Sequence, residues 1–224
     1  LTAGDPDFET SLNWIQQLPE SGVDFVEIGM PISDSMADGP SIQLSSQRAL
    51  KSGMNMINCL SLVEKFRKLN THTPIILMGY YNPIYKFGKE KFIQQCLNSG
   101  VDGLIVVDLP PEEDDEFYIE AEKNKLNMIR LITPTTNEKR LNKILFNATG
   151  FVYYVSITGI TGTQAPNIEN VSSKLKKIKS VTDLPVVIGF GIRSPSQALS
   201  IANISDGIIV GSAVVDLIES SLDK

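Results

Sequence analysis

The chain has 224 residues, of which 42% are hydrophobic and 21% charged, and its formal net charge is −6 at pH 7. These values are ordinary for a globular α/β protein, and we expect residues 1–224 to form a single domain. The acidic balance argues against nucleic-acid binding, and no apolar run approaches the roughly 20 residues that a membrane-spanning helix needs.

Cysteine and histidine are scarce, which limits the chemistry available. Cys59 and Cys96 form no metal or redox motif, so we interpret them as buried thiols of a reducing compartment. His72 is the single histidine and lies in a polar loop, so we expect no metal site. No signal peptide is visible, and we expect a cytoplasmic location, or a plastid one if a transit peptide preceded the chain.

The first half of the chain alternates between strand and helix patterns. Leu1 and Thr2 resemble the end of a strand, and Asp5 followed by Pro6 predicts the cap and first position of a helix. Helical spacing then covers residues 8–18, 41–69 with a break near Ser52, and 89–98, and a further helix is expected from residue 111. Apolar runs predict buried strands over 25–29, 74–80 and 103–107.

The second half continues the alternation. Strands are expected over 128–132, 151–156, 185–188 and 207–210, and helices over 137–146, after 168, after the capping box that begins at Ser194, and over 213–221.

Counting Leu1–Thr2, this gives eight strands, each followed by a helix, and their apolar character indicates parallel strands covered on both faces. The segment 206–210 also echoes the segment 102–106. We therefore predict a (β/α)8 TIM barrel, with a doubly wound open sheet as the alternative. Because the first strand is nearly absent and the last helix is short, we expect a barrel truncated at both termini.

The strand over 25–29 carries a carboxylate among apolar residues. Alternation places Val26 and Ile28 on one face and Glu27 on the other. The following loop contains Asp34 and Asp38, just past the carboxyl end of the strand, where α/β folds place active sites. A buried glutamate with a purely structural partner is the alternative reading of Glu27.

Three glycine-bearing loops, at 158–162, 189–191 and 211–213, follow the sixth, seventh and eighth predicted strands. In a barrel, backbone N–H groups of these loops and of a short helix form a phosphate site, although each loop alone could be a tight turn. Because the single histidine lies in a polar loop and no metal site is expected, the acid and base must be carboxylates, with a tyrosine as a further candidate. Glu27, Asp38 and Asp108 are the candidates, and Tyr153 points inward if Tyr154 points outward; the opposite parity is also possible.

Residues 27–40 closely resemble the signature of the tryptophan synthase α-subunit family, and further similar motifs lie at 2–6, 78–83, 108–110, 155–162 and 189–192. Ser35 stands where that family usually has proline. The resemblance implies retro-aldol cleavage of indole-3-glycerol phosphate to indole and glyceraldehyde 3-phosphate. It implies no cofactor in this chain and an α2β2 assembly with a β subunit that carries pyridoxal phosphate.

The resemblance also implies roles for individual residues. Glu27 would shuttle protons, and Asp38 would accept the indole N1–H. The other expected contacts are the substrate-binding residues Tyr153, Met78, Tyr80, Ile105 and Thr161 and the phosphate-binding residues Gly162, Gly191, Gly211 and Ser212. Three other functions remain open at this point: a different phosphosugar isomerase or epimerase, a non-catalytic activator of a partner subunit, and a stand-alone indole-releasing lyase.

Overall fold

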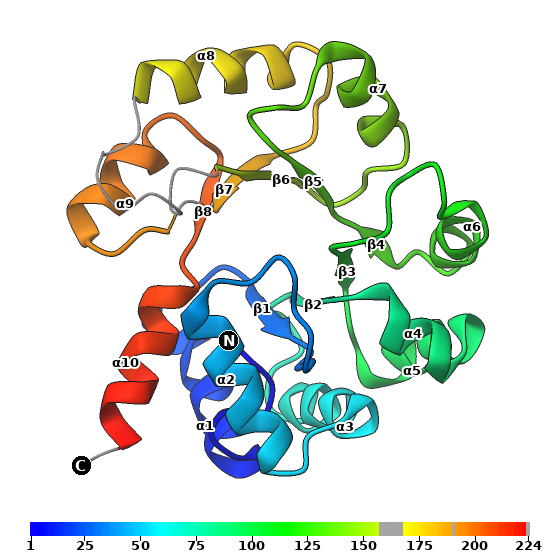
Figure 1. The fold of residues 1–224 in the computed structure, drawn as a ribbon, viewed down its shortest axis with the longest axis vertical. Coiled ribbons are helices and arrows are strands. Elements are labelled where there is room, and N and C mark those ends of the chain that lie inside the picture. The colour runs from blue at the N-terminus through cyan, green and yellow to red at the C-terminus, as the bar shows by residue number, and fades with distance from the viewer. Residues whose placement is uncertain (157–167, 190, 223–224) are drawn as a thin grey trace. The chain divides into compact units, whose positions relative to one another are not determined.

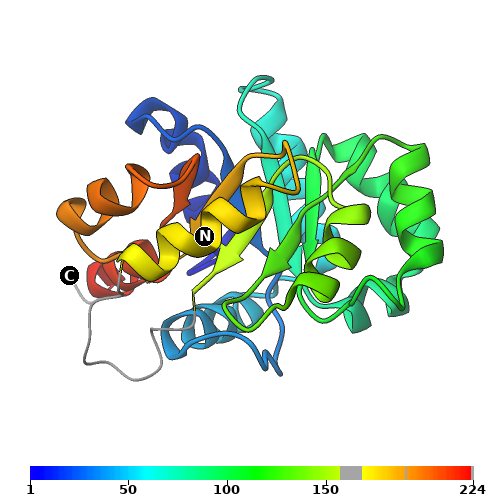
Figure 2. The ribbon, with the colours of Figure 1, turned by 90° about the horizontal axis from the view of Figure 1, so that it is seen from above.

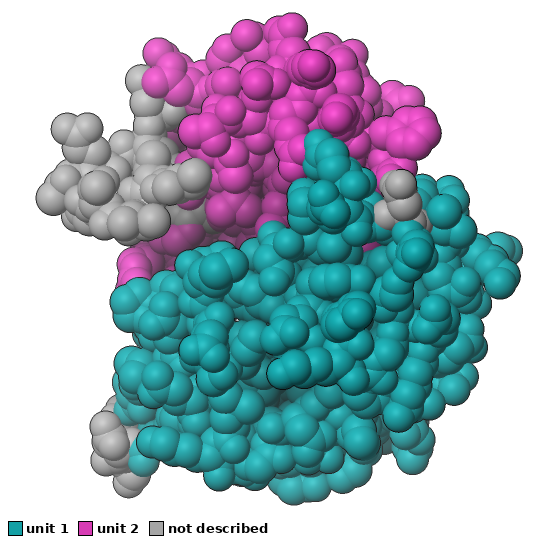
Figure 3. All heavy atoms as spheres, turned by 45° about the vertical axis from the view of Figure 1, so that its right-hand side comes forward, with its two compact units in different colours: residues 1–127, 215–224 teal, residues 128–214 magenta. Residues whose placement is uncertain are grey.

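The computed structural model describes residues 1–156, 168–189 and 191–222. The chain divides into two compact units, Leu1–Asn127 with Val215–Lys224 (unit 1) and Met128–Val214 (unit 2), which Figure 3 shows in teal and magenta. Each unit carries parallel strands that alternate with helices, as predicted for an α/β fold. The expectation of one domain over residues 1–224 stays a prediction.

Unit 1 contains a parallel sheet with the strand order β1-β2-β3-β4 (Figure 1). Its strands are β1 (Val26–Gly29), β2 (Ile75–Gly79), β3 (Gly103–Val106) and, at the boundary, β4 (Asn127–Met128). Its helices are α1 (Phe8–Gln17), the 3-10 helix η1 (Pro19–Ser21), α2 (Pro40–Lys51), α3 (Met56–Arg67), α4 (Tyr81–Phe87), α5 (Lys89–Ser99), α6 (Asp115–Lys123) and most of α10 (Ser212–Leu222).

The register of this sheet fixes which side chains share a face. Glu27 pairs with Ile76, and Met78 lies between Gly29 and Ile105. Since side chains alternate along parallel strands in register, Glu27, Met78 and Ile105 belong to one face. Val26 and Ile28 belong to the other face and are fully buried, which confirms the predicted parity of β1.

Several local predictions for unit 1 are wrong. Asp7, rather than Asp5, caps α1 by accepting from the Thr10 N–H at 2.9 Å. Asp5 is buried instead, where it accepts from the Ser45 hydroxyl at 2.5 Å and pairs with Arg48. A buried carboxylate needs such partners, and they are distant in sequence, so no local pattern indicates them.

Element boundaries also differ from expectation. The predicted first strand is only an isolated bridge between Thr2 and Gly29. The helix expected from residue 111 begins at Asp115, and α4 was not predicted. The strand expected over 128–132 is split at Ile129 into β4 and β5 (Arg130–Ile132).

Unit 2 continues with a parallel sheet in the order β5-β6-β7-β8. Its other strands are β6 (Val152–Val155), β7 (Val186–Gly189) and β8 (Gly207–Ile209), and its helices are α7 (Glu138–Phe146), α8 (Ile168–Lys179) and α9 (Pro195–Ala202). Figures 1 and 2 show α7 and α8 beside these strands, and their apolar residues pack with the strands in one cluster that includes Leu141, Leu175, Tyr154 and Ile188. Ser194 caps α9, as its capping box predicted.

The weak sequence repeat has a structural counterpart in each unit. In unit 1, the Asp102 carboxylate accepts from the Ile75 N–H at 2.7 Å and pairs with Arg67. In unit 2, the Asp206 carboxylate accepts from the Val186 N–H at 2.8 Å and from the Lys179 ammonium at 2.5 Å. Each aspartate precedes a strand and fixes the first residues of the preceding strand together with a cation from a nearby helix.

Two expectations concern the described residues as a whole. Within them, no helix is long and apolar enough to cross a membrane, and no group of three or more histidine, cysteine or acidic side chains could hold a metal ion. Cys59 and Cys96 are both buried free thiols, as predicted, and burial raises the pKa of Cys59 to about 12.

Candidate active site

Glu27 lies in the middle of β1, with its backbone fixed by the β1–β2 ladder. Its Oε2 atom is buried and has no hydrogen-bond partner among the residues that the structure describes. Burial raises the pKa of this carboxyl, the nearby Leu1 amino group acts in the opposite direction, and the charge of Asp38 raises the pKa further. Glu27 can therefore hold a proton at a pH where an ordinary glutamate has lost it.

Asp38 lies near the end of the loop that joins β1 to α2, close enough to Glu27 for their charges to interact. Burial raises its pKa, and hydrogen bonds with the Ser35 and Tyr80 side chains lower it. The backbone carbonyl of Asp38 accepts from Gln43 Nε2 at 2.8 Å. The catalytic roles expected for Glu27 and Asp38 stay predictions.

Tyr80 follows β2 and was predicted to line an apolar indole pocket. It is 6% exposed, and its hydroxyl oxygen accepts from the Ala37 N–H at 3.0 Å. Burial raises the pKa of this hydroxyl, and the Asp38 carboxylate also raises it, so the phenol keeps its proton. Tyr80 therefore fixes the loop between β1 and α2, which carries Asp38. The sequence alone did not indicate this role.

The apolar part of this face comes from β2 and β3. Met78 is half-buried and pairs in register with Ile105, which is fully buried. Gly79 lies beside the Met30 side chain, whose Cε would be 2.5 Å from a Cβ at that position. Because Gly79 has no side chain, the Met30 side chain can pack against the end of β2.

Asp108 was a third acid candidate. Its Oδ1 accepts from the Tyr81 N–H at 2.7 Å, at the start of α4. An acceptor at a helix start satisfies one of the free N–H groups there, so Asp108 has a structural function in this arrangement.

Unit 2 holds the predicted tyrosine. Tyr154 packs with α7 and α8, so Tyr153 belongs to the opposite face, which decides between the two parities that the sequence analysis left open. The Tyr153 ring lies against Gly189, where a Cβ would be 2.3 Å from the hydroxyl oxygen. Gly189 therefore makes room for this tyrosine, although the sequence suggested it only as part of a phosphate loop.

The glycine loops are described in part. Gly191 is exposed and has φ +58°, a backbone conformation that favours glycine. Gly211 precedes α10, and its carbonyl accepts from the Val214 N–H at 2.9 Å, so Ser212 is the first helical residue. The phosphate-binding role expected for Gly191, Gly211 and Ser212 stays a prediction. Thr161 and Gly162 lie outside the described residues.

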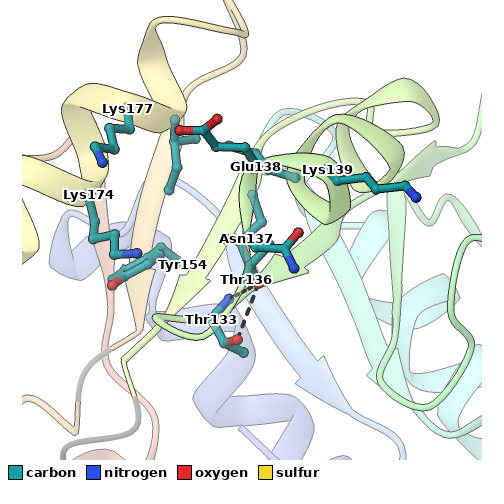
Figure 4. A pocket seen from close by; sticks show the side chains of 11 residues that line it. Thr133, Thr136, Asn137, Glu138, Lys139, Tyr154, Lys174 and Lys177 are labelled. Atoms are coloured by element: carbon teal, nitrogen blue, oxygen red, sulfur yellow. Dashed lines mark hydrogen bonds between the residues drawn. The ribbon is translucent and has the colours of Figure 1, made fainter.

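A cavity of about 520 Å³ lies elsewhere in unit 2, between α7 and α8 (Figure 4). It is lined by Thr133, Asn137, Tyr154, Lys174 and Lys177, among others, and by none of the predicted site residues. Its lining mixes apolar and polar side chains and includes one carboxylate, Glu138, so it holds no acid pair like that of Glu27 and Asp38.

Two neighbours of Asp38 along the chain were not foreseen as important from the sequence. Ser35 was noted only as a departure from a family pattern, yet it is buried and lowers the pKa of the Asp38 carboxyl. Gln43 lies in the following helix and gave no signal.

Comparison with known proteins decides the family. The whole chain, residues 1–224, matches the family described as "Tryptophan synthase alpha chain". The chain belongs to this family. It is 41% identical to tryptophan synthase subunit alpha from Legionella pneumophila, covers 82% of that chain with 100% of its own, and superposes with a TM-score of 0.93.

Two further solved structures are similar. In a tryptophan synthase complex from Pyrococcus furiosus, the matching chain is 38% identical. The match covers 99% of this chain and 88% of that one, with a TM-score of 0.90. The matching chain of tryptophan synthase from M. tuberculosis is 33% identical. The match covers 98% of this chain and 84% of that one, with a TM-score of 0.89. Family membership confirms the resemblance, the lyase class and the fold class, an α/β fold with parallel strands like that of the family's barrels.

Proposed function

We propose that this chain cleaves indole-3-glycerol phosphate to indole and glyceraldehyde 3-phosphate with Glu27 and Asp38 as its catalytic pair. The observation that carries the proposal is a family match over residues 1–224 in which the buried Oε2 of Glu27 has no hydrogen-bond partner among the described residues and the charge of Asp38 acts on the Glu27 carboxyl. A different phosphosugar isomerase lacks support from the family match.

The cleavage needs one proton donor and one proton acceptor. Protonation of indole C3 gives an indolenine, and removal of the proton from the adjacent glycerol hydroxyl lets the C–C bond electrons return to the ring. The products are indole and an aldehyde, and the two proton transfers balance. A Glu27 carboxyl with a raised pKa can give the first proton and, as carboxylate, take the second.

Asp38 serves the ring nitrogen. Protonation at C3 places positive charge on the indolenine, and a carboxylate that accepts the N1–H stabilises that charge. Met78 and Ile105, on the face that carries Glu27, supply apolar contacts for the ring, with Tyr80 at the loop. Tyr153 supports the substrate from β6.

The phosphate would be held by backbone N–H groups. Gly191, Gly211 and the first turn of α10 at Ser212 would offer them, and the family resemblance adds Gly162. The resemblance gives Thr161 as a further substrate-binding residue.

A β subunit is the proposed partner. One similar structure is described as a study of mutual activation of the tryptophan synthase α2β2 complex from Pyrococcus furiosus. We extend this to the present chain: an α2β2 assembly in which pyridoxal phosphate belongs to the β subunit and this chain carries no cofactor of its own. A cytoplasmic location is part of the same proposal.

Indole release from indole-3-glycerol phosphate tests the function, measured with and without a β subunit. Glu27→Gln should abolish cleavage but keep substrate affinity, because it preserves shape and removes the transferable proton. Glu20→Gln, at an exposed position, is the matched control. Since general acid–base groups contribute about 10²–10⁴-fold, turnover of Glu27→Gln within tenfold of the parent contradicts the assignment. Unchanged activity on addition of the β subunit would indicate a stand-alone lyase.

A further inference from the structure

The cavity between α7 and α8 lies entirely within unit 2 (Figure 4). Its volume of about 520 Å³ is in the range of cavities that bind small molecules. Residues of β5, β6, α7 and α8 line it, and none of them belongs to the predicted active site. The cavity is therefore a candidate for a second binding site.

The charge of the lining favours an anion. Its charged residues are three lysines and one glutamate, namely Lys139, Lys174, Lys177 and Glu138, in a chain whose net charge is −6. Lys174 and Lys177 lie one turn apart on α8, and neither forms an ion pair with a carboxylate in the part of the chain that the structure describes. Figure 4 shows the Lys174 side chain extending from α8 toward Tyr154, whereas Lys139 extends away from α8. Two ammonium groups on one helix face attract an anion to this side of the cavity.

Tyr154 lines the cavity from β6 and carries a hydrogen-bonding group without a protein partner. The residue is only 2% exposed, and its hydroxyl forms no hydrogen bond with any described residue. A buried hydroxyl normally has a hydrogen-bond partner. Burial raises the pKa of this hydroxyl, so it keeps its proton at neutral pH and can donate it in a hydrogen bond to an anion.

The turn before α7 is fixed by its own hydrogen bonds. The Thr133 N–H donates to the Thr136 hydroxyl at 3.1 Å, and the Thr136 N–H donates to the Thr133 carbonyl at 3.0 Å. Asn137 then caps α7 by accepting from the Arg140 N–H at 2.9 Å. The first turn of α7 also lines the cavity, and the positive end of the helix dipole adds to the attraction of the lysines for an anion.

We propose that this cavity binds a small organic anion, a carboxylate or phosphate that carries an apolar body. Lys174 and Lys177 attract the anionic group, and the Tyr154 hydroxyl donates a hydrogen bond to it. Leu141 and Ile178, which are buried in the lining, contact the apolar body. The site is separate from the residues of the proposed cleavage, so its test does not depend on that reaction.

The test is a titration of the full chain with phenyl phosphate, benzoate and inorganic phosphate, followed by two-dimensional amide NMR. We expect an aromatic anion to shift the backbone signals of Glu138, Lys174 and Lys177 saturably, and to bind more tightly than inorganic phosphate, which lacks an apolar body. The tighter of the two aromatic anions identifies the anionic group. Signals that do not move, or that move only near Gly211 and Ser212, overturn the proposal, and so does equal affinity for inorganic phosphate.

Substitutions test which side chains hold the probe. Lys174→Gln combined with Lys177→Gln should raise the dissociation constant of the tighter probe about tenfold, because both positive charges are lost. Tyr154→Phe removes only the hydroxyl and should raise it about fivefold. Lys176→Gln is the matched control, because Lys176 is exposed on the same helix and does not line the cavity. An unchanged dissociation constant in either the double lysine variant or Tyr154→Phe, or an equal rise in the control, overturns the assignment.

Discussion

The hydroxyl oxygen of Tyr80 lies 3.0 Å from the Ala37 backbone nitrogen, which donates a hydrogen bond to it. This bond joins residues 43 positions apart and connects the end of β2 to the loop that follows β1. Loops of this kind are usually the most mobile parts of a barrel. Here Ala37, the residue before Asp38, is hydrogen-bonded to the buried Tyr80 side chain. This bond restricts the backbone next to Asp38.

Tyr80→Phe should therefore impair catalysis more than folding. The change removes the acceptor for Ala37 and the donor for Asp38 and keeps the buried ring. We expect a loss of about 1 kcal/mol in unfolding free energy and at least a tenfold loss in kcat/KM. Denaturant unfolding and indole release measure the two effects. Tyr85→Phe, at an exposed position of α4, is the control, and equal catalytic losses in the two variants would contradict the role of Tyr80.

Glu27→Gln should make the fold more stable, and increasingly so as the pH rises. The pKa of Glu27 is raised in the folded chain by burial, so the unfolded chain loses this proton at a lower pH. From the ordinary glutamate value upward, deprotonation thus favours unfolding of the parent, and the variant has no such penalty. Thermal unfolding at pH 4 and pH 8 measures this, and a gap between variant and parent that narrows toward pH 8 would refute it.

Gly189→Ala should displace Tyr153, because the new methyl group would be 2.3 Å from the phenol oxygen and 2.4 Å from Cε1. Overpacking of this kind costs about 1–3 kcal/mol. Gly207→Ala is the control in the neighbouring strand, where the nearest atom is at an ordinary 3.5 Å. Chemical denaturation compares them, and the double variant Gly189→Ala with Tyr153→Ala should recover part of the loss. Equal stability of the two alanine variants would show that Tyr153 does not fill this space.

Asp206→Asn should destabilise the chain at neutral pH and not in acid. Lys179 and the Val186 N–H lower the pKa of Asp206 in the folded state. A lowered pKa contributes stability that is present above the unfolded value and is lost as the pH falls through the folded one. Because both side chains are partly exposed, we expect only about 1 kcal/mol at pH 7. Urea unfolding at pH 7 and pH 2.5 measures it, with the exposed Asp183→Asn as the control, and an effect that persists at pH 2.5 would contradict the linkage.

Local signals explain why much of the architecture was predictable. The apolar alternation around Glu27 fixed its face, and the caps at Asn137 and Ser194 each depend on a donor three residues away. The residues in each of these interactions lie within a few positions of one another in the sequence. The parity of Tyr153 was narrowed to two choices, and packing of Tyr154 against helices decides between them.

The errors arise where distant residues compete with local ones. Asp5 has the sequence context of a helix cap, but its contacts with Ser45 and Arg48 bury it, and Asp7 caps the helix instead. The conformation of the loop that carries Asp38 likewise depends on hydrogen bonds of Ala37 with the distant Tyr80 and of the Asp38 carbonyl with Gln43. No spacing rule describes such a loop.

The hydrogen bonds that the Asp102 and Asp206 carboxylates accept lie at the amino ends of β2 and β7. Asp38 and Tyr80 lie beyond the carboxyl ends of β1 and β2. Substitutions that alter substrate choice can accumulate at one end of a strand without weakening the anchor at the other. Selection for stability and selection for a new activity thus act on different residues. This fold can therefore acquire a new specificity while the residues that stabilise the amino ends of its strands stay unchanged.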